Sequence, residues 1–168
     1  MRRTVAIACL ALQATLTAPL THAATDTANL QVKLVITETC DIHTAATTAV
    51  DFGTQARASG PVTVTATGSV TVNCSPNTSY SIGLNGGSNA PAVPTPGQRK
   101  MKGSLGAFVP YDLYQDASTT AFWGNAAGSV VSGSGSGGNQ TYQVYGKLTN
   151  VNFAADTYVD TVVATVTY

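Results

Sequence analysis

Residues 62–74 alternate between two kinds of side chain in the longest such run of the chain. Every even position from Val62 to Cys74 is apolar or small, and every odd position is Ser, Thr or Asn. Because successive side chains of a strand point to opposite faces, the run predicts a β-strand with one buried face, and its parity places Cys74 on that face. β-branched residues such as Thr and Val favour strands over helices, since they lose rotamer freedom in a helix. The first expectation is an all-β protein.

Similar patterns elsewhere predict further strands, separated by turn-forming residues. The candidate strands cover residues 30–36, 80–84, 108–114, 141–148 and 158–168. In the last of them, one face is shared by Val162, Ala164, Val166 and Tyr168. Residues 132–138, a run of Ser and Gly, are expected to form a loop that connects two strands. Short strands separated in this way are typical of a β-sandwich, and 168 residues suffice for one domain.

Residues 1–23 are expected to be a secretory signal peptide that is removed. Arg2 and Arg3 form a short positive region, an interrupted apolar stretch follows, and the small residues Thr21 and Ala23 suit a cleavage site. The apolar stretch is shorter and more polar than the roughly 20 residues that a membrane-spanning helix needs. We therefore expect export of residues 24–168 with no stable membrane insertion, and loss of Cys9 with the signal peptide.

Two cysteines remain in the expected mature chain, Cys40 and Cys74. In an exported protein such a pair predicts a disulfide, because the oxidising compartment favours it and a small core gains from a constraint on the unfolded chain. Closing a loop of this length is worth roughly 3 to 4 kcal/mol in the chain-entropy model. The alternative is a metal site that includes His43, but two Cys and one His without a C-x-x-C spacing make a poor zinc site. We predict neither a metal nor a cofactor.

The scarcity of charged and catalytic residues argues against two classes of function. Only 10% of the residues are charged, 8 basic and 8 acidic, so no basic stripe is available to bind nucleic acid. His43 is the one histidine of the expected mature chain, and the G-x-S-x-G letters at residues 133–137 fall in the Ser/Gly run, where repetition produces such a match. We predict that the protein is not an enzyme and does not bind nucleic acid.

A weaker set of signals concerns ligand binding. The carboxylates of Asp112, Asp116, Asp156 and Asp160 are interpreted as solvated groups of loops and strand ends in preference to a calcium or sugar site. A carbohydrate-stacking surface would need the aromatic side chains of Tyr111, Tyr114, Phe122 and Trp123. The alternation of Tyr111 with Leu113 is more typical of core packing, whereas Trp123 beside Gly124 would suit a loop tip.

The two ends of the mature chain both have strand patterns. Leu30, Val32, Leu34 and Ile36 alternate at the N-terminus, and the last strand runs to Tyr168, so no residue follows it to cover its edge. An exposed edge invites another chain's strand, and a spare strand at one end with a free edge at the other allows head-to-tail addition. Residues 30–36 are therefore either a strand of their own sheet or a strand given to a neighbour.

Several short segments stand in a characteristic order along the chain. They are Gln31-Val32-Lys33-Leu34 before Cys40, Val70-Thr71-Val72-Asn73-Cys74 with Ser79-Tyr80-Ser81-Ile82 and Gly86-Gly87, Arg99-Lys100-Met101, Pro110-Tyr111-Asp112-Leu113-Tyr114-Gln115-Asp116 with Phe122-Trp123-Gly124, Val144-Tyr145-Gly146-Lys147, and Tyr158-Val159-Asp160-Thr161-Val162. This ordered set resembles the spore coat U domain family, which includes the subunits of archaic chaperone–usher pili, and the likeness covers nearly all of the mature chain.

The resemblance implies an incomplete immunoglobulin-like sandwich of six strands, with a disulfide between the first two. Residues 24–37 would be an N-terminal extension that fills the groove of a neighbouring subunit, and residues 38–168 would be the pilin domain. The donor side chains would be Leu30, Val32, Leu34 and Ile36. The terminal strand that borders the acceptor groove would contribute Val162, Ala164, Val166 and Tyr168.

The same resemblance implies the partners and the location. The partners would be like or related pilin subunits in a head-to-tail polymer, a periplasmic chaperone that lends a strand, and an outer-membrane usher. A single domain suits a shaft or adaptor subunit of a surface fimbrium that supports adhesion or biofilm formation. Two alternatives stay open: a coat protein of a spore or cell surface, and a monomeric lectin-like module in which residues 30–36 complete their own sheet.

Overall fold

The computed structural model describes residues 24–42 and 48–168, and all the regular secondary structure in these ranges is β-strand. The largest sheet contains, in spatial order, β1 (Cys40–Asp41), β2 (Val64–Cys74), β8 (Asn139–Leu148) and β6 (Asp112–Tyr114). A second sheet has the order β10 (Ala164–Thr167), β3 (Ser79–Leu84) and β7 (Val131–Ser134). A small third sheet has the order β5 (Phe108–Pro110), β4 (Lys100–Gly103) and β9 (Tyr158–Val159). The predicted all-β fold is confirmed.

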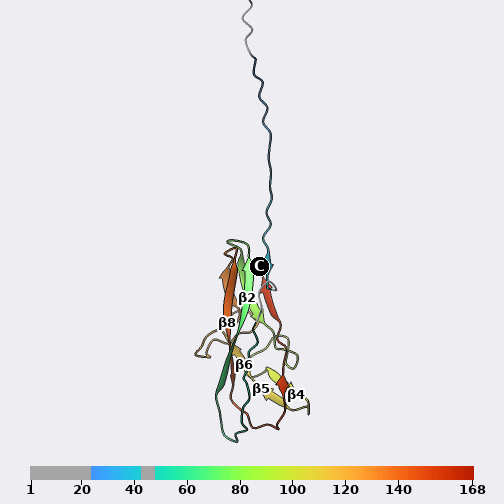
Figure 1. Cartoon of the computed structure of the whole chain (residues 1–168), viewed down its shortest axis with the longest axis vertical. Coiled ribbons are helices and arrows are strands. Elements are labelled where there is room, and N and C mark those ends of the chain that lie inside the picture. The colour runs from blue at the N-terminus through green and yellow to red at the C-terminus, as the bar shows by residue number, and fades with distance from the viewer. Residues whose placement is uncertain (1–23, 43–47) are drawn as a thin grey trace, which may run out of the picture. The chain divides into compact units, whose positions relative to one another are not determined.

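The antiparallel pair of β2 and β8 forms the centre of the largest sheet (Figure 1). Its register runs from Val64 opposite Leu148 to Asn73 opposite Asn139, so the predicted strand at residues 62–74 is confirmed almost to its ends. One expectation about its faces was wrong, because Ser69 and Thr71 on the polar face are also buried. Neighbouring segments cover them: the Ser69 hydroxyl lies 2.9 Å from that of Thr48, and the Thr71 hydroxyl lies 2.9 Å from that of Thr141.

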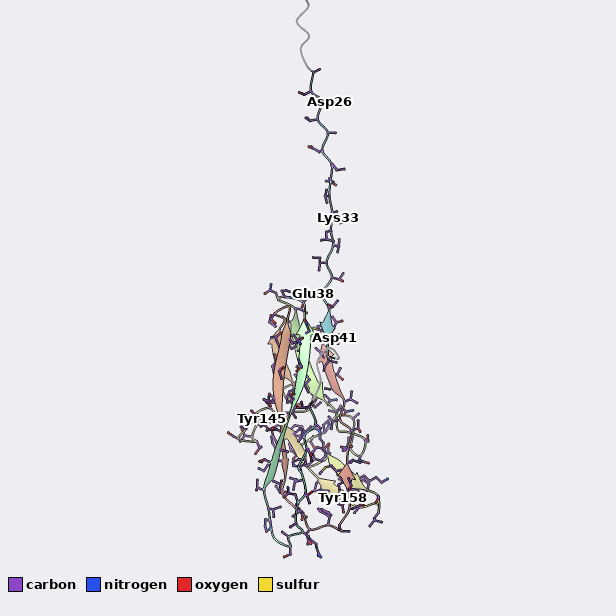
Figure 2. All side chains as sticks on the ribbon, viewed as in Figure 1. Asp26, Lys33, Glu38, Asp41, Tyr145 and Tyr158 are labelled. Carbon is purple, nitrogen blue, oxygen red and sulfur yellow. A yellow bond between two sulfur atoms is a disulfide. The ribbon has the colours of Figure 1, made fainter. Side chains whose placement is uncertain are left out.

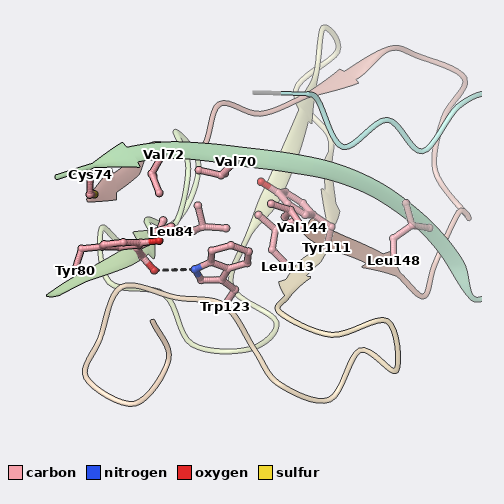
Figure 3. Close-up of a cluster of buried hydrophobic side chains, with 11 residues drawn as sticks. Val70, Val72, Cys74, Tyr80, Leu84, Tyr111, Leu113, Trp123, Val144 and Leu148 are labelled. Carbon is pink, nitrogen blue, oxygen red and sulfur yellow. Dashed lines mark hydrogen bonds between the residues drawn. The ribbon is translucent and has the colours of Figure 1, made fainter. Parts of the chain in front are cut away.

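The core lies between the two larger sheets. The largest sheet contributes Val70, Val72, Cys74, Leu113, Val144 and Leu148, and the second sheet contributes Tyr80, Ile82 and Leu84. Trp123 is fully buried in this cluster, where its indole N–H donates a 2.9 Å hydrogen bond to the carbonyl of Ile82 (Figure 3). The expectation that Trp123 sits at a loop tip was therefore wrong. Its backbone N–H also bonds the carbonyl of Leu113, which draws this segment inward.

Two of the predicted strands are each divided between sheets. Residues 108–114 form β5, which pairs with β4, and β6, which pairs with β8, and the chain changes sheet at Tyr111, whose N–H bonds the carbonyl of Arg99. Residues 158–168 form β9, which pairs with β4, and β10, which pairs with β3. The described residues contain ten strands where six were expected. Division of these two segments adds two strands, and β1, β4 and β7 are short strands that the sequence patterns did not predict.

The Ser/Gly run contains a strand that was predicted as a loop. Residues 131–134 form β7, in which Gly133 lies opposite Tyr80. A side chain at Gly133 would overlap the Tyr142 hydroxyl group and the hydroxyl end of the Tyr80 side chain, and these two hydroxyl groups are 2.6 Å apart. Glycine in this strand therefore makes room for an inter-sheet tyrosine pair, a requirement that a composition rule for loops does not detect.

The N-terminal segment, residues 24–35, is a separate unit from residues 36–168. It has no regular secondary structure and is drawn as an extended chain in Figure 2. Leu30 and Val32 are 89% and 91% exposed. The predicted signal peptide, residues 1–23, lies outside the described residues, as does His43. In the described part of the chain, no helix is long and apolar enough to cross a bilayer.

Candidate functional site

The outer edge of β10 is an incomplete part of the sandwich. β10 pairs with β3, with Ala164 opposite Leu84 and Val166 opposite Ile82, and within the described residues no strand pairs with its other edge. An unpaired edge presents a row of N–H and C=O groups that can accept another strand. The edge therefore has the backbone chemistry to bind one more extended segment.

The side chains of this edge are only partly covered. Val162, Ala164 and Val166 are half-buried and pack against the core cluster, as the shared face of the predicted strand requires. Tyr168 was assigned to the same face, but it is 59% exposed and lies beside a shallow hollow with Ser79 and Ser81. The acceptor surface predicted at the terminal strand thus comprises three half-buried aliphatic residues and an exposed tyrosine.

The four predicted donor residues, unlike the half-buried aliphatic residues of the β10 edge, all have exposed apolar side chains. Leu30, Val32, Leu34 and Ile36 are 80% to 91% exposed. Exposing this many aliphatic side chains in one short segment is unfavourable in water, at about 25 cal/mol for each Å² of apolar surface. A segment of this kind is typical of a strand that is buried against a partner.

A disulfide anchors the chain shortly after this segment. Cys40 and Cys74 are bonded and lie directly opposite each other in the β1–β2 pair, with their Cα atoms 4.0 Å apart. Thr39 and Ser75 extend the connection, since the Ser75 N–H donates to the Thr39 carbonyl and the Thr39 N–H donates to the Ser75 hydroxyl. The predicted disulfide is confirmed, and it fastens the first strand of the domain to the central strand.

The structure gives Asp160 a role that sequence reasoning missed. This carboxylate was interpreted as solvated, but it is half-buried and accepts a 2.7 Å hydrogen bond from the Tyr111 hydroxyl. Burial, and then this hydrogen bond, raise the pKa of Tyr111 well above its ordinary value. The available signal was parity, because Asp160 has the even register of Val162, Ala164 and Val166 and therefore points toward the core side.

Arg99 is a second buried polar group that the sequence analysis quoted only as part of a motif. Its guanidinium is fully buried and donates to the carbonyls of Leu84, Asn85 and Trp123 at 2.8 to 3.0 Å. Its Cζ atom also lies 5.1 Å from the centre of the Phe122 ring. Burial lowers the pKa of Arg99 from its usual value, although guanidinium remains charged in proteins. These bonds tie the end of β3 to the segment that carries Trp123.

The remaining candidate residues do not assemble a ligand site. Tyr111 and Trp123 are buried, and the Tyr114 and Phe122 rings pack edge to face, so the four aromatic residues form no common stacking surface. Within residues 24–42 and 48–168, no group of three or more His, Cys, Asp or Glu side chains is placed to hold a metal ion. Asp112 is half-buried, and burial raises the pKa of its carboxyl group. It accepts two hydrogen bonds from the Gly97 N–H, a structural role.

Comparison with known proteins gives results that agree with this geometry. Protein U of Myxococcus xanthus is 32% identical to this chain over 163 aligned positions, which cover 88% of this chain and 87% of that protein. A similar solved chain occurs in the crystal structure of the CsuC–CsuE chaperone–tip adhesion subunit pre-assembly complex from archaic chaperone–usher Csu pili of Acinetobacter baumannii. The TM-score is 0.54 and the identity 26%.

The solved structure and the family model match this chain over different extents. The solved chain is matched over 79% of this chain but over only 40% of its own length. The Spore Coat Protein U domain, by contrast, matches residues 26–165, which include the exposed N-terminal residues, the disulfide and the first half of β10. The resemblance inferred from the ordered motifs is confirmed: this chain belongs to the Spore Coat Protein U domain family.

Proposed function

We propose that this protein is a structural subunit of a surface fibre of the archaic chaperone–usher type, and that its subunits join by donor-strand exchange. Residues 24–37 of one copy would lie along the free edge of β10 in the next subunit. One observation supports this most directly. The alternating apolar side chains from Leu30 to Ile36 are exposed, while the residues beside the unpaired β10 edge are only half-buried.

Burial of the donor side chains would be the main favourable contribution to such a joint. Four aliphatic side chains at about 1.5 to 3 kcal/mol each would contribute roughly 6 to 12 kcal/mol. The conformational entropy lost when the extension becomes ordered opposes binding, and the new ladder hydrogen bonds add to the gain. Side chains of even number would point into the groove, whereas Gln31 and Lys33 would face solvent.

The same edge would need protection before assembly. A periplasmic chaperone that lends a strand would cover β10 first, and an outer-membrane usher would then guide its replacement by the neighbouring subunit. The likeness to a chain of a chaperone–tip adhesion subunit pre-assembly complex supports a chaperone as a partner before assembly. The fibre would be exported through the periplasm and would support adhesion or biofilm formation at the cell surface.

A coat layer on a spore or cell surface is the second candidate. It is favoured by the family description, Spore Coat Protein U domain, and by the likeness to Protein U. Both candidates use the same joint between subunits. A neighbouring chaperone and usher in the genome would support the fibre, whereas their absence would support the coat.

The test is an unboiled, non-reducing denaturing gel of the mature chain expressed with a chaperone and an usher of this type. Wild type is expected to give a ladder that collapses to monomer on boiling. Val32→Asp should abolish the ladder because it places a charge in the groove, and the matched Gln31→Asp should preserve it. Equal loss from both substitutions would contradict the proposal. If wild type and a truncation lacking residues 24–37 are both monomeric, and the truncation is also unfolded, the segment is an internal strand.

A further inference from the structure

Three segments that are far apart in the sequence meet at the carboxylate of Asp160. Its Oδ1 atom accepts hydrogen bonds from the Ser88 N–H at 2.9 Å, the Asn89 side-chain amide at 3.1 Å and the Thr161 N–H at 2.9 Å. Its Oδ2 atom accepts the 2.7 Å bond from the Tyr111 hydroxyl. One side chain thus joins the loop after β3, the junction of β5 with β6, and the chain leading into β10.

The loop after β3 is shaped to receive this carboxylate. A Cβ atom at Gly87 would overlap Asp160 Oδ2, and the φ angle of Gly87 is +79°, which L side chains rarely adopt. Glycine is therefore required at position 87, where a side chain would displace the Asp160 carboxylate. Gly86-Gly87 and the segment around Asp160, two motifs that are far apart in the sequence, therefore meet in the fold.

Asn85 makes a second connection next to the first. Its N–H donates to the Val163 carbonyl at 3.0 Å, and its Oδ1 accepts bonds from the N–H groups of Val163 and Gly87 at 2.8 and 3.0 Å. Residues 160–163 have no regular strand pairing, and these bonds hold them between β9 and β10. The ladder of β10 with β3 begins immediately afterwards, at Ala164 opposite Leu84.

We propose that Asp160 is a positioning residue that holds β10 in place as the acceptor edge before a donor strand arrives. This inference rests on the proposed function. β10 is four residues long and paired on one side, so its own ladder holds it weakly. Binding costs less when the receiving surface is already ordered. The hydrogen bonds from its four donors to the Asp160 carboxylate hold in place the residues that lead into β10.

Asp156, on the other side of the short strand β9 from Asp160, provides a matched control. Its carboxylate accepts bonds from the Leu105 N–H at 3.0 Å and from the Ser104 hydroxyl and Thr157 N–H at 2.8 Å. These partners belong to the β4–β5 turn and to Asp156's own neighbour. The two aspartates are the same residue type and accept bonds from four and three donor groups, respectively, but only Asp160 is bonded to the loop after β3.

The experiment compares full mature chains of wild type, Asp160→Ala and Asp156→Ala. Hydrogen–deuterium exchange of residues 161–168 is measured first, without any donor, and then capture of a labelled synthetic peptide of residues 24–37. We expect Asp160→Ala to speed exchange at 161–168 about tenfold and to weaken peptide capture by a similar factor. Asp156→Ala should leave both within about twofold of wild type and speed exchange in the β4–β5 turn instead. Equal exchange at 161–168 in the two variants would overturn the inference.

A second pair of variants covers the case in which Asp160→Ala does not fold, as judged by Trp123 fluorescence. Gly87→Ala introduces a side chain against Asp160, while Gly106→Ala has a similar φ of +85° and open space around it. Faster exchange at 161–168 in Gly87→Ala alone supports the inference, and equal effects overturn it. If wild type captures no peptide, donor-strand exchange is contradicted, whereas the exchange data still decide whether Asp160 positions β10.

Discussion

Residues 30–36 and strand β2 have the same alternation of apolar residues, yet their side chains end in opposite environments. Val70 and Val72 of β2, which has a strand on each side, are 5% and 0% exposed. Val32, to which no strand pairing is assigned, is 91% exposed. β10, with one neighbour, is intermediate, since Ala164 and Val166 are half-buried. The same alternation therefore leads to burial only where other segments cover the apolar face, because alternation only determines which side chains share a face.

The strongest test of this comparison applies one polar substitution to both regions. Val72→Asn should lower the free energy of unfolding by about 3 kcal/mol or more, since it buries an amide without a partner. Val32→Asn should change it by less than about 0.5 kcal/mol, because the side chain is already in water. Urea unfolding followed by the fluorescence of Trp123, the one tryptophan of the chain, measures both. A large destabilisation by Val32→Asn would show that the segment completes its own domain.

Removal of the disulfide that joins Cys40 to the end of β2 should have the next largest effect. Replacing Cys40 and Cys74 together with Ser should cost roughly 3 to 4 kcal/mol, since the bond closes a loop between residues 34 positions apart. Reductant should lower the urea midpoint of wild type to that of the double variant and leave the variant unchanged. A reductant effect on the double variant would contradict this assignment.

A smaller effect is expected where glycine allows another segment to pack on the central strands. A Cβ atom at Gly146 of β8 would overlap the Val50 side chain and lie 2.9 Å from Phe52, whose ring packs edge to face on Tyr111. Gly146→Ala should therefore destabilise the domain by about 1 to 3 kcal/mol. Gly60→Ala, which has open space around it, is the control, and its effect should stay within about 0.5 kcal/mol. Equal thermal midpoints for the two variants would contradict the packing account.

The smallest expected effect is a loss of stability at acidic pH, and it involves the carboxylate of Asp156 at the β4–β5 turn. The hydrogen bond from the Leu105 N–H, followed by that from Ser104, holds the pKa of Asp156 below its ordinary value of 3.8. A carboxylate with a lowered pKa stabilises the fold above the unfolded-state value, and this contribution is lost as the pH falls through the folded-state pKa. Unfolding midpoints should therefore be flat near pH 5 and fall below pH 3.8. Asp156→Asn should reduce that fall, and an unchanged pH profile would show that this carboxylate has no part in it.

Prediction from the sequence worked best where a pattern is local. The strand at residues 62–74 and the disulfide followed from side-chain parity and cysteine count, and the structure confirms both. It failed at Trp123, because a Trp-Gly pair does not reveal that the Leu113 and Ile82 carbonyls bind it in the core. It failed again at Gly133, where the need for glycine comes from two tyrosines on other strands.

In the candidate site, too, the sequence predicted some residues correctly and missed others. Parity identified Val162, Ala164 and Val166 as residues of one face, and the structure places all three half-buried against the core. Parity also includes Asp160, but its four hydrogen-bond donors come largely from residues 49 to 72 positions away. Such a meeting of distant donors depends on the loop after β3 returning beside the chain that enters β10, which no local pattern encodes.

The amino-acid sequence alone determined the fold class, the pairing of Cys40 with Cys74 and the face on which each alternating side chain lies, because backbone geometry converts spacing into direction. The tertiary structure decided which of those faces are buried, where edge strands change sheets, and that Arg99 and Asp160 are structural polar groups. Burial and hydrogen bonding are properties of pairs of segments, and a strand acquires them only when its neighbours are in place.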